Sequence, residues 1–174
     1  MWRFLGGFVA AIILVALGAF VTVWFGLIPA GADVKQGKFE HWAARRSLHV
    51  AIDRGMPQPP YPGDPGSDTT LAAGAKLYIA NCSACHGTGS EESTIAKGMY
   101  IKPPQFSTDG VDDDPEGETY WKIEHGIRFS AMPSFKKILT EQQIWQIAAF
   151  LKRPSDQLPP AADKIWKEPR TSGA

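Results

Sequence analysis

The sequence predicts an all-α protein that begins with a single transmembrane helix, and three observations support this prediction. Residues 4–28 include no charged side chain. Two later segments repeat apolar residues at helical spacing, a third is bounded by helix start and stop signals, and no stretch alternates in the manner of a half-buried strand. A chain of 174 residues is long enough for one domain of ordinary size in addition to the first helix.

The first helix is long enough to span a bilayer. A helix over residues 4–28 would measure about 37 Å, which exceeds a hydrocarbon core of about 30 Å. Trp2 and Trp24 lie near its two ends, where indole rings favour the membrane interface. Residues 30–32 (AGA) also fit a signal-peptide cleavage site, but the apolar core of a signal peptide usually has only about 7–15 residues. We therefore expect residues 1–32 to form an uncleaved anchor.

Residues 33–67 are expected to connect the anchor to a folded domain. Phe39 and Trp42 fall at helical spacing within a segment that also carries arginines. This segment is interpreted either as a helix on the membrane surface or as a spacer helix that packs on the domain or a partner. Residues 55–67 contain five prolines, which is typical of a semi-rigid spacer, so a domain boundary is placed at about residue 67.

Residues 68–153 are predicted to hold the three amphipathic helices of the domain. The first runs from about Thr69 into Cys85, the second has Asp114 as N-cap and ends at Gly126, and the third begins with a capping box at Thr140 and stops before Pro154. Such short helices with long loops would build a poor core alone, so we expect another group to fill the middle. The extension 154–174 is long enough to form a docking segment.

Both cysteines of the chain fall in one short motif. Cys82, Cys85 and His86 form the spacing C-x-x-C-H, which is the attachment signature of a c-type haem. Residues i and i+3 of one helical turn face the same way, so two thiols can form thioethers on one edge of the porphyrin. The histidine that follows then lies beneath the iron. The motif therefore predicts one covalent haem c.

Two other interpretations of the motif fit less well. A zinc site needs four ligands, and the chain has no further cysteine, which leaves only His41, His49 and His125 to complete it. A thioredoxin-like pair would follow a strand, whereas this pair ends an amphipathic helix.

Two runs of the domain resemble the class I c-type cytochromes. They are residues 74–78 (GAKLY) followed by 82–87 (CSACHG), and residues 126–133 (GIRFSAMP) before a last amphipathic helix. The resemblance covers about residues 68–153. It implies a cytochrome c fold around one covalent haem, in which the first and last helices cross closely. The residues that match this crossing are Gly74, Tyr78, Trp145 and Ala148.

The resemblance also implies the second axial iron ligand. Met132, next to Pro133, matches the family position for the distal ligand, so the metal ligands are expected to be His86 and Met132. A thioether is a weak, soft donor that raises the reduction potential relative to a second imidazole. Met99 is the next candidate, and His125 would give a bis-histidine haem of lower potential.

A proline carbonyl is expected to bind the iron-ligating histidine. Pro103 and Pro104 resemble the family loop in which such a carbonyl accepts a hydrogen bond from the proximal imidazole. The doubled proline leaves open which of the two accepts the bond.

A haem with both axial positions filled by protein leaves no vacant site for a substrate. We therefore expect an electron carrier, or the electron-transfer subunit of an oxidoreductase complex, rather than an enzyme. The alternatives are a haem-based ligand sensor or haem enzyme with a displaceable sixth ligand, and a purely structural subunit. Carbon monoxide binding to the reduced protein distinguishes the carrier from the sensor or enzyme.

Charge and maturation constrain the partners and the location. The chain has 18 basic and 18 acidic side chains, which argues against a nucleic-acid binder. Bacterial haem attachment takes place outside the cytoplasmic membrane, so the resemblance implies a single-pass protein of the inner membrane with its haem domain in the periplasm. The expected partners are redox proteins, including a membrane-bound oxidase or dehydrogenase complex.

Overall fold

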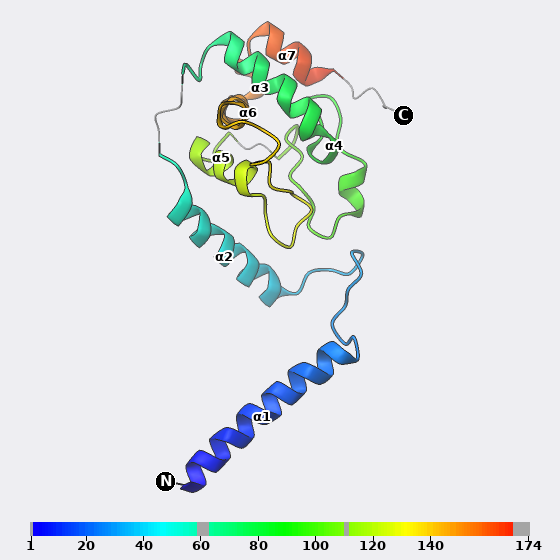
Figure 1. Cartoon of the computed structure of the whole chain (residues 1–174). Helices are drawn as coiled ribbons and strands as arrows, with labels where there is room; N and C mark the ends of the chain where they lie inside the picture. The colour runs from blue at the N-terminus through cyan, green and yellow to red at the C-terminus, as the bar shows by residue number, and fades with distance from the viewer. Residues whose placement is uncertain (1, 59–62, 110–111, 169–174) are drawn as a thin grey trace. The chain divides into compact units, whose positions relative to one another are not determined.

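The computed structural model describes residues 2–58, 63–109 and 112–168 (Figure 1). Within these ranges the chain forms helices and no strand, which confirms the predicted all-α class. The α-helices are α1 (Trp2–Trp24), α2 (Lys38–Gly55), α3 (Asp68–Asn81), α4 (Ser83–His86), α5 (Glu116–His125), α6 (Glu141–Lys152) and α7 (Pro160–Lys167). Two short 3-10 helices are η1 (Ile95–Gly98) and η2 (Ser155–Gln157).

The chain divides into two compact units, residues 1–34 and residues 35–174. The second unit therefore contains α2 and α7 in addition to the helices of the expected domain. The limits 1–32, 33–67, 68–153 and 154–174 remain predictions.

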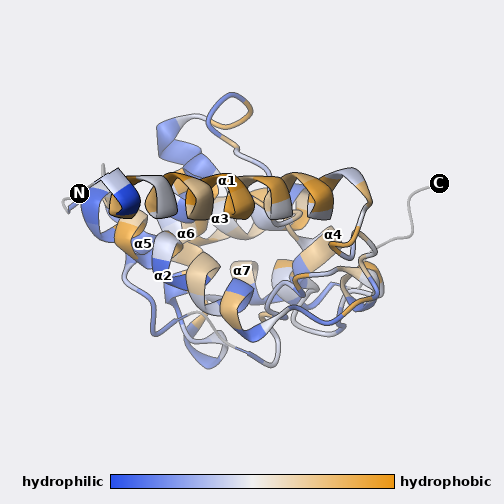
Figure 2. Ribbon diagram, turned by 90° about the horizontal axis from the view of Figure 1, so that it is seen from below, coloured by the Kyte–Doolittle hydropathy of each residue, from blue (hydrophilic) through white to orange (hydrophobic). Residues whose placement is uncertain are grey.

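The first unit consists of α1 and the turn that follows it. The helix is apolar beyond its first residues, as Figure 2 shows, and none of its side chains is buried. It ends at Trp24, four residues before the expected end, because the chain turns at Phe25 and Gly26. By length and composition α1 is able to cross a membrane, although a signal sequence would pass the same test.

The core of the second unit forms where α3 packs against α6 and α7, and α6 against α5 (Figure 1). Helix α6 begins with the predicted capping box, in which Gln143 N–H donates to Thr140 Oγ1 at 3.3 Å and Thr140 N–H to Gln143 Oε1 at 2.9 Å. Most of the side chains in its last two turns are buried. The largest buried apolar side chains of the cluster are Leu71, Tyr78, Tyr120, Ile123, Phe135, Leu139, Ile144, Trp145, Ile147, Phe150, Leu151 and Trp166.

Two other helix starts differ from the prediction by one residue. Helix α3 begins at Asp68 and not at Thr69, and the hydroxyl of its N-cap Ser67 accepts a bond from Thr70 N–H at 3.2 Å. Helix α5 has Pro115 as its N-cap because the side chain of Asp114 turns away to bind Lys122 Nζ at 2.8 Å. An ion pair has therefore replaced the expected side-chain cap.

Helices α3 and α6 approach closely at Gly74. A Cβ atom at this buried position would overlap the backbone carbonyl oxygen of Gln146 and lie 2.8 Å from Cβ of Phe150. The ring of Tyr78 meets Phe150 at 5.7 Å, whereas Trp145 packs on Tyr120 of α5 at 4.4 Å. The expected crossing thus has its small residue at Gly74, but the aromatic ring that Tyr78 meets from α6 is that of Phe150.

Gly74→Ala is therefore expected to destabilise the protein. Helix propensity alone would favour alanine by about 1 kcal/mol, but the overlap with backbone atoms forces α3 and α6 apart. Overpacking of this kind costs about 1–3 kcal/mol of stability. The substitution should therefore lower the free energy of unfolding, although alanine is the better helix former. Urea unfolding of the purified protein measures the change in stability, with Lys76→Ala on the exposed side of the same helix as the control. An unchanged or raised urea midpoint for Gly74→Ala would show that the helices do not meet there.

The segment after α6 is part of the core. Trp166 of α7 is 5% exposed, and its ring packs on Tyr78 at 5.2 Å and on Phe150 at 5.6 Å. Its carbonyl accepts a bond from Gly89 N–H at 2.8 Å. The expectation of a docking segment is corrected on this point, because Trp166 of this extension is buried inside the same unit.

Candidate functional site

The cysteine motif forms a separate helical turn after α3. Cys82 is the C-cap of α3, and its carbonyl accepts bonds from Cys85 N–H at 3.1 Å and His86 N–H at 3.0 Å. The two thiols are free and half-buried. Burial, reinforced by the neighbouring Cys85, raises the pKa of the Cys82 thiol to about 12, so this group stays protonated in the free protein. The turn places both sulfur-bearing residues on one side, as the i, i+3 spacing predicts.

The imidazole of His86 is held in one tautomer. Its Nδ1 atom lies 2.9 Å from the carbonyl oxygen of Pro104. A carbonyl only accepts, so Nδ1 carries the proton and Nε2 carries the lone pair. Burial lowers the pKa of His86 and outweighs the hydrogen bond to Pro104, which acts in the opposite direction. The ring is therefore a neutral donor at neutral pH, which is the state that binds a metal.

The two prolines have different partners. Pro104 O accepts the bond from His86, whereas Pro103 O accepts a bond from Gln105 Nε2 at 3.0 Å. The same Nε2 donates to Cys85 O at 3.0 Å, and Gln105 Oε1 accepts from Ser93 N–H at 2.7 Å. The amide of Gln105 thus fastens the proline loop to the cysteine turn.

Two residues of this site were not predicted from the sequence. One is Gln105, and the only sequence feature that could have pointed to it is its position directly after the two prolines. The other is Phe106, whose ring stacks on His86 at 4.6 Å and whose N–H donates to His86 O at 3.2 Å. Gln105 bonds to Cys85 and Phe106 bonds to His86, so each residue contacts one that lies 20 positions earlier in the chain. Contacts over such a distance leave no periodic pattern in the sequence.

Met132 lies in a tightly hydrogen-bonded loop between α5 and α6. Gly126 has φ +68°, and a Cβ there would come within 2.6 Å of the carbonyl carbon of Pro133. Ile127 N–H donates to Met132 O at 3.1 Å, and Met132 N–H donates to Ser130 Oγ at 3.1 Å. The side chain of Met132 is partly buried against the core cluster, as are those of Cys82 and Phe106. The loop therefore presents Met132 to the same apolar cluster that borders the cysteine turn.

The other candidate ligands lie elsewhere. His125 is exposed, its ring stacks on Trp121 at 4.6 Å, and its Nδ1 lies 3.2 Å from the Trp121 carbonyl of its own helix. Met99 follows η1 and is not among the side chains that pack on the core cluster. His41 and His49 are exposed on α2. Across the described ranges no group of three or more histidine, cysteine and carboxylate side chains gathers as a metal site.

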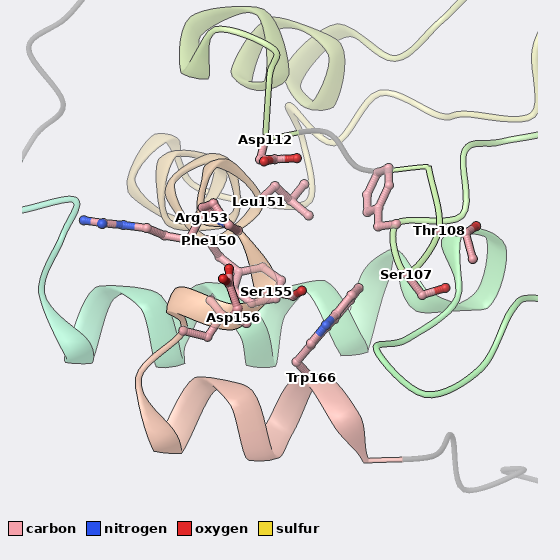
Figure 3. A pocket seen from close by; sticks show the side chains of 12 residues that line it. Ser107, Thr108, Asp112, Phe150, Leu151, Arg153, Ser155, Asp156 and Trp166 are labelled. Carbon is pink, nitrogen blue, oxygen red and sulfur yellow. The ribbon is translucent and has the colours of Figure 1, made fainter.

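An open pocket of about 250 Å³ lies on another part of the domain, between the end of α6, α7 and the loop after Phe106 (Figure 3). Arg153, Asp156 and Trp166 are among its lining residues. Neither cysteine, nor His86, nor Met132 lines it. Phe106, whose ring stacks on His86, does line the pocket, so the pocket borders the site without including its thiols, His86 or Met132.

Comparison with known proteins identifies the family. The family model for cytochrome c oxidase, cbb3-type, subunit III matches residues 69–151. The chain is similar to cytochrome c6 of Parathermosynechococcus lividus, with 32% identity over 81 residues that cover 47% of this chain and 86% of the relative. The chain belongs to the class I c-type cytochromes. This membership confirms the expected fold and implies haem c as the cofactor.

Two further relatives extend the comparison. Cytochrome c6 of Limnospira maxima is 32% identical over 81 residues, which cover 47% of this cytochrome and 89% of the relative. The cbb3-type cytochrome c oxidase subunit FixP of Sinorhizobium medicae (strain WSM419) is 33% identical over 89 residues, but only 29% of its length is covered. No solved structure matches the chain significantly.

The residues of the site fit a haem c. Two thiols one helical turn apart suit two thioether bonds, and a neutral imidazole with its lone pair on Nε2 suits iron. The sulfur of Met132 adds a soft donor of the kind found in cytochromes c.

Proposed function

We propose that the chain carries one haem c bound covalently through Cys82 and Cys85, with His86 and Met132 as iron ligands, and that it transfers single electrons. The observation that supports this most strongly is the C-x-x-C-H turn with its histidine held by Pro104, in a chain of the cytochrome c family. When bound, the haem supplies an iron that alternates between the ferric and ferrous states.

Each residue of the site has a defined part in this proposal. The thiols of Cys82 and Cys85 hold the porphyrin, so it cannot dissociate. His86 offers Nε2, and the carbonyl of Pro104 orients the ring and makes it a stronger donor. Met132 would supply the second iron ligand and would leave no coordination site for water or substrate. Gln105 keeps the proline loop at the cysteine turn, so the orientation of His86 is fixed before an electron arrives.

The intact mass of the denatured full-length protein tests the covalent part of the proposal. We expect the mass of the polypeptide plus one haem, and a tryptic peptide containing residues 82–86 that retains the haem. Cys82→Ser and Cys85→Ser each remove one thioether and should lower the yield of haem-bearing protein. A purified wild-type protein whose haem is released by acid and organic solvent would contradict covalent attachment.

We further propose that α1 tethers the protein to the bacterial inner membrane, with the haem domain in the periplasm. The length and apolar character of α1 support the anchor. The match to FixP, whose name gives it as a subunit of a cbb3-type oxidase, supports a membrane-bound oxidase as redox partner. A dehydrogenase complex would be the alternative donor or acceptor.

Replacing residues 1–32 by a cleavable signal peptide should release the protein from the membrane. The core of the second unit includes no side chain from α1, so the haem domain should fold with an unchanged absorption spectrum. Cell fractionation followed by spectroscopy measures this. Haem-loaded protein that stays in the membrane fraction would show that α1 is not the anchor, and loss of the haem signal would show that the domain needs the replaced residues.

A further inference from the structure

One face of α2 combines exposed aromatic rings with basic side chains. Phe39 is 77% exposed and Trp42 is 62% exposed, and their rings lie 5.7 Å apart. At 100° per residue, these two side chains and three basic ones fall within an arc of about 120°. We call this arc the aromatic-basic face, and its residues are Lys38, Phe39, Trp42, Arg45 and Arg46, all of them exposed.

The rest of α2 is tied to the domain. Ile52 is buried, and Gly55 lies so close to Trp121 of α5 that a Cβ there would be 2.7 Å from the indole nitrogen. Near the start of the helix, Tyr100 Oη donates to both carboxylate oxygens of Glu40 at 2.8 Å. Glu40 lies outside the aromatic-basic face. These contacts hold α2 against the domain and leave the aromatic-basic face turned outward.

Charge is unevenly divided along the chain. Residues 35–54 carry five basic and two acidic side chains, whereas residues 68–153 carry nine basic and eleven acidic ones. The only acidic side chain of α2 within the same arc is Asp53, two turns beyond Arg46. A surface of positive charge with an aromatic pair at its centre suits a layer of anionic headgroups, where indole and phenyl rings settle at the interface.

We infer that the aromatic-basic face of α2 binds the anionic lipid surface of the membrane in which α1 is anchored. This inference rests on the proposed anchoring function of α1. Only residues 25–37 separate the two helices, and a chain of this length reaches at most about 45 Å. A membrane-spanning α1 therefore keeps α2 permanently within reach of the lipid headgroups. Because α2 is packed on α5, its binding would fix the orientation of the haem domain relative to the membrane.

Spin labels on opposite sides of α2 test this inference in the full-length, haem-loaded protein. The natural cysteines are consumed by the haem in the proposed function, so His49→Cys and Ala44→Cys each provide one labelling site. Position 49 lies within the arc of the aromatic-basic face and position 44 lies opposite, and both are exposed. The protein is placed in nanodiscs of phosphatidylcholine alone or of phosphatidylcholine mixed with phosphatidylglycerol.

In the mixed nanodiscs we expect the label at position 49 to collide more with oxygen and less with a water-soluble nickel chelate than the label at position 44. Each basic side chain near an anionic surface changes the bound-to-free ratio about fivefold. Arg45→Glu with Arg46→Glu should therefore lower the ratio of lipid-bound to free α2 at least 25-fold. Lys76→Glu with Lys164→Glu makes the same change of charge on α3 and α7 and should leave it unchanged.

Equal exposure of both labels to the nickel chelate in the mixed nanodiscs would overturn the inference. Protection of position 49 that develops only after solubilised membrane proteins are added would assign the face to a protein partner and would also overturn it. Labelling of the unsubstituted protein at Cys82 or Cys85 is a separate result, since it would show that the proposed haem attachment has failed.

Discussion

His86→Ala is expected to yield no stable haem-loaded protein. The substitution removes the imidazole whose Nε2 is oriented by Pro104, and it breaks the signature that guides covalent attachment. It also removes the ring on which Phe106 stacks at 4.6 Å, so the proline loop loses a second contact. Haem staining of periplasmic and membrane fractions, together with immunodetection of the polypeptide, measures the loss.

His125→Ala is the matched control for this substitution. His125 is exposed and contacts its own helix, so its removal should leave the amount of haem-loaded protein and its spectrum unchanged. If His86→Ala accumulated normal amounts of covalently bound, low-spin haem, the assignment of the proximal ligand would be wrong.

Met132→Ala is expected to open the sixth coordination position. The reduced variant should bind carbon monoxide readily, whereas the wild-type protein should not, and the weak near-infrared sulfur-to-iron band of the oxidised protein should disappear. Met132→His should stay six-coordinate and low-spin, because imidazole also binds iron. Its reduction potential should fall by on the order of 0.2 V, a part of the roughly 0.8 V that axial ligands span.

Met99→Ala is the matched control for the methionine series. Met99 does not pack on the core cluster, so its loss should change neither the near-infrared band nor carbon monoxide binding. A band that survives in Met132→Ala and vanishes in Met99→Ala would assign the ligand to Met99 instead.

The sequence predicted those features that are encoded over a few neighbouring residues. The capping box at Thr140 is satisfied within four residues, and the C-x-x-C-H turn within five, so both could be predicted from spacing alone. Gly126 and Pro133 likewise mark the loop that presents Met132. The start of α5 was misplaced because Asp114 has a competing partner, Lys122, eight residues away.

Contacts between distant segments could not be predicted in this way. The amide of Gln105 reaches Cys85 across 20 positions, and nothing in the local sequence marks it as the residue that fastens the proline loop. Trp166 packs on Tyr78 of α3, although the length of the extension 154–174 had suggested a docking segment. One hydrogen bond distinguishes the two prolines, since the carbonyl of Pro104 and not that of Pro103 accepts the hydrogen bond from His86 Nδ1.

A redox titration of the full-length protein under argon and under carbon monoxide tests the central claim most directly. A one-haem electron carrier with His86 and Met132 on the iron should give a single one-electron transition with the same midpoint under both gases, because no axial position is vacant. Carbon monoxide binds only ferrous haem, so a midpoint that rises under this gas would show an open or displaceable site and would contradict the carrier function.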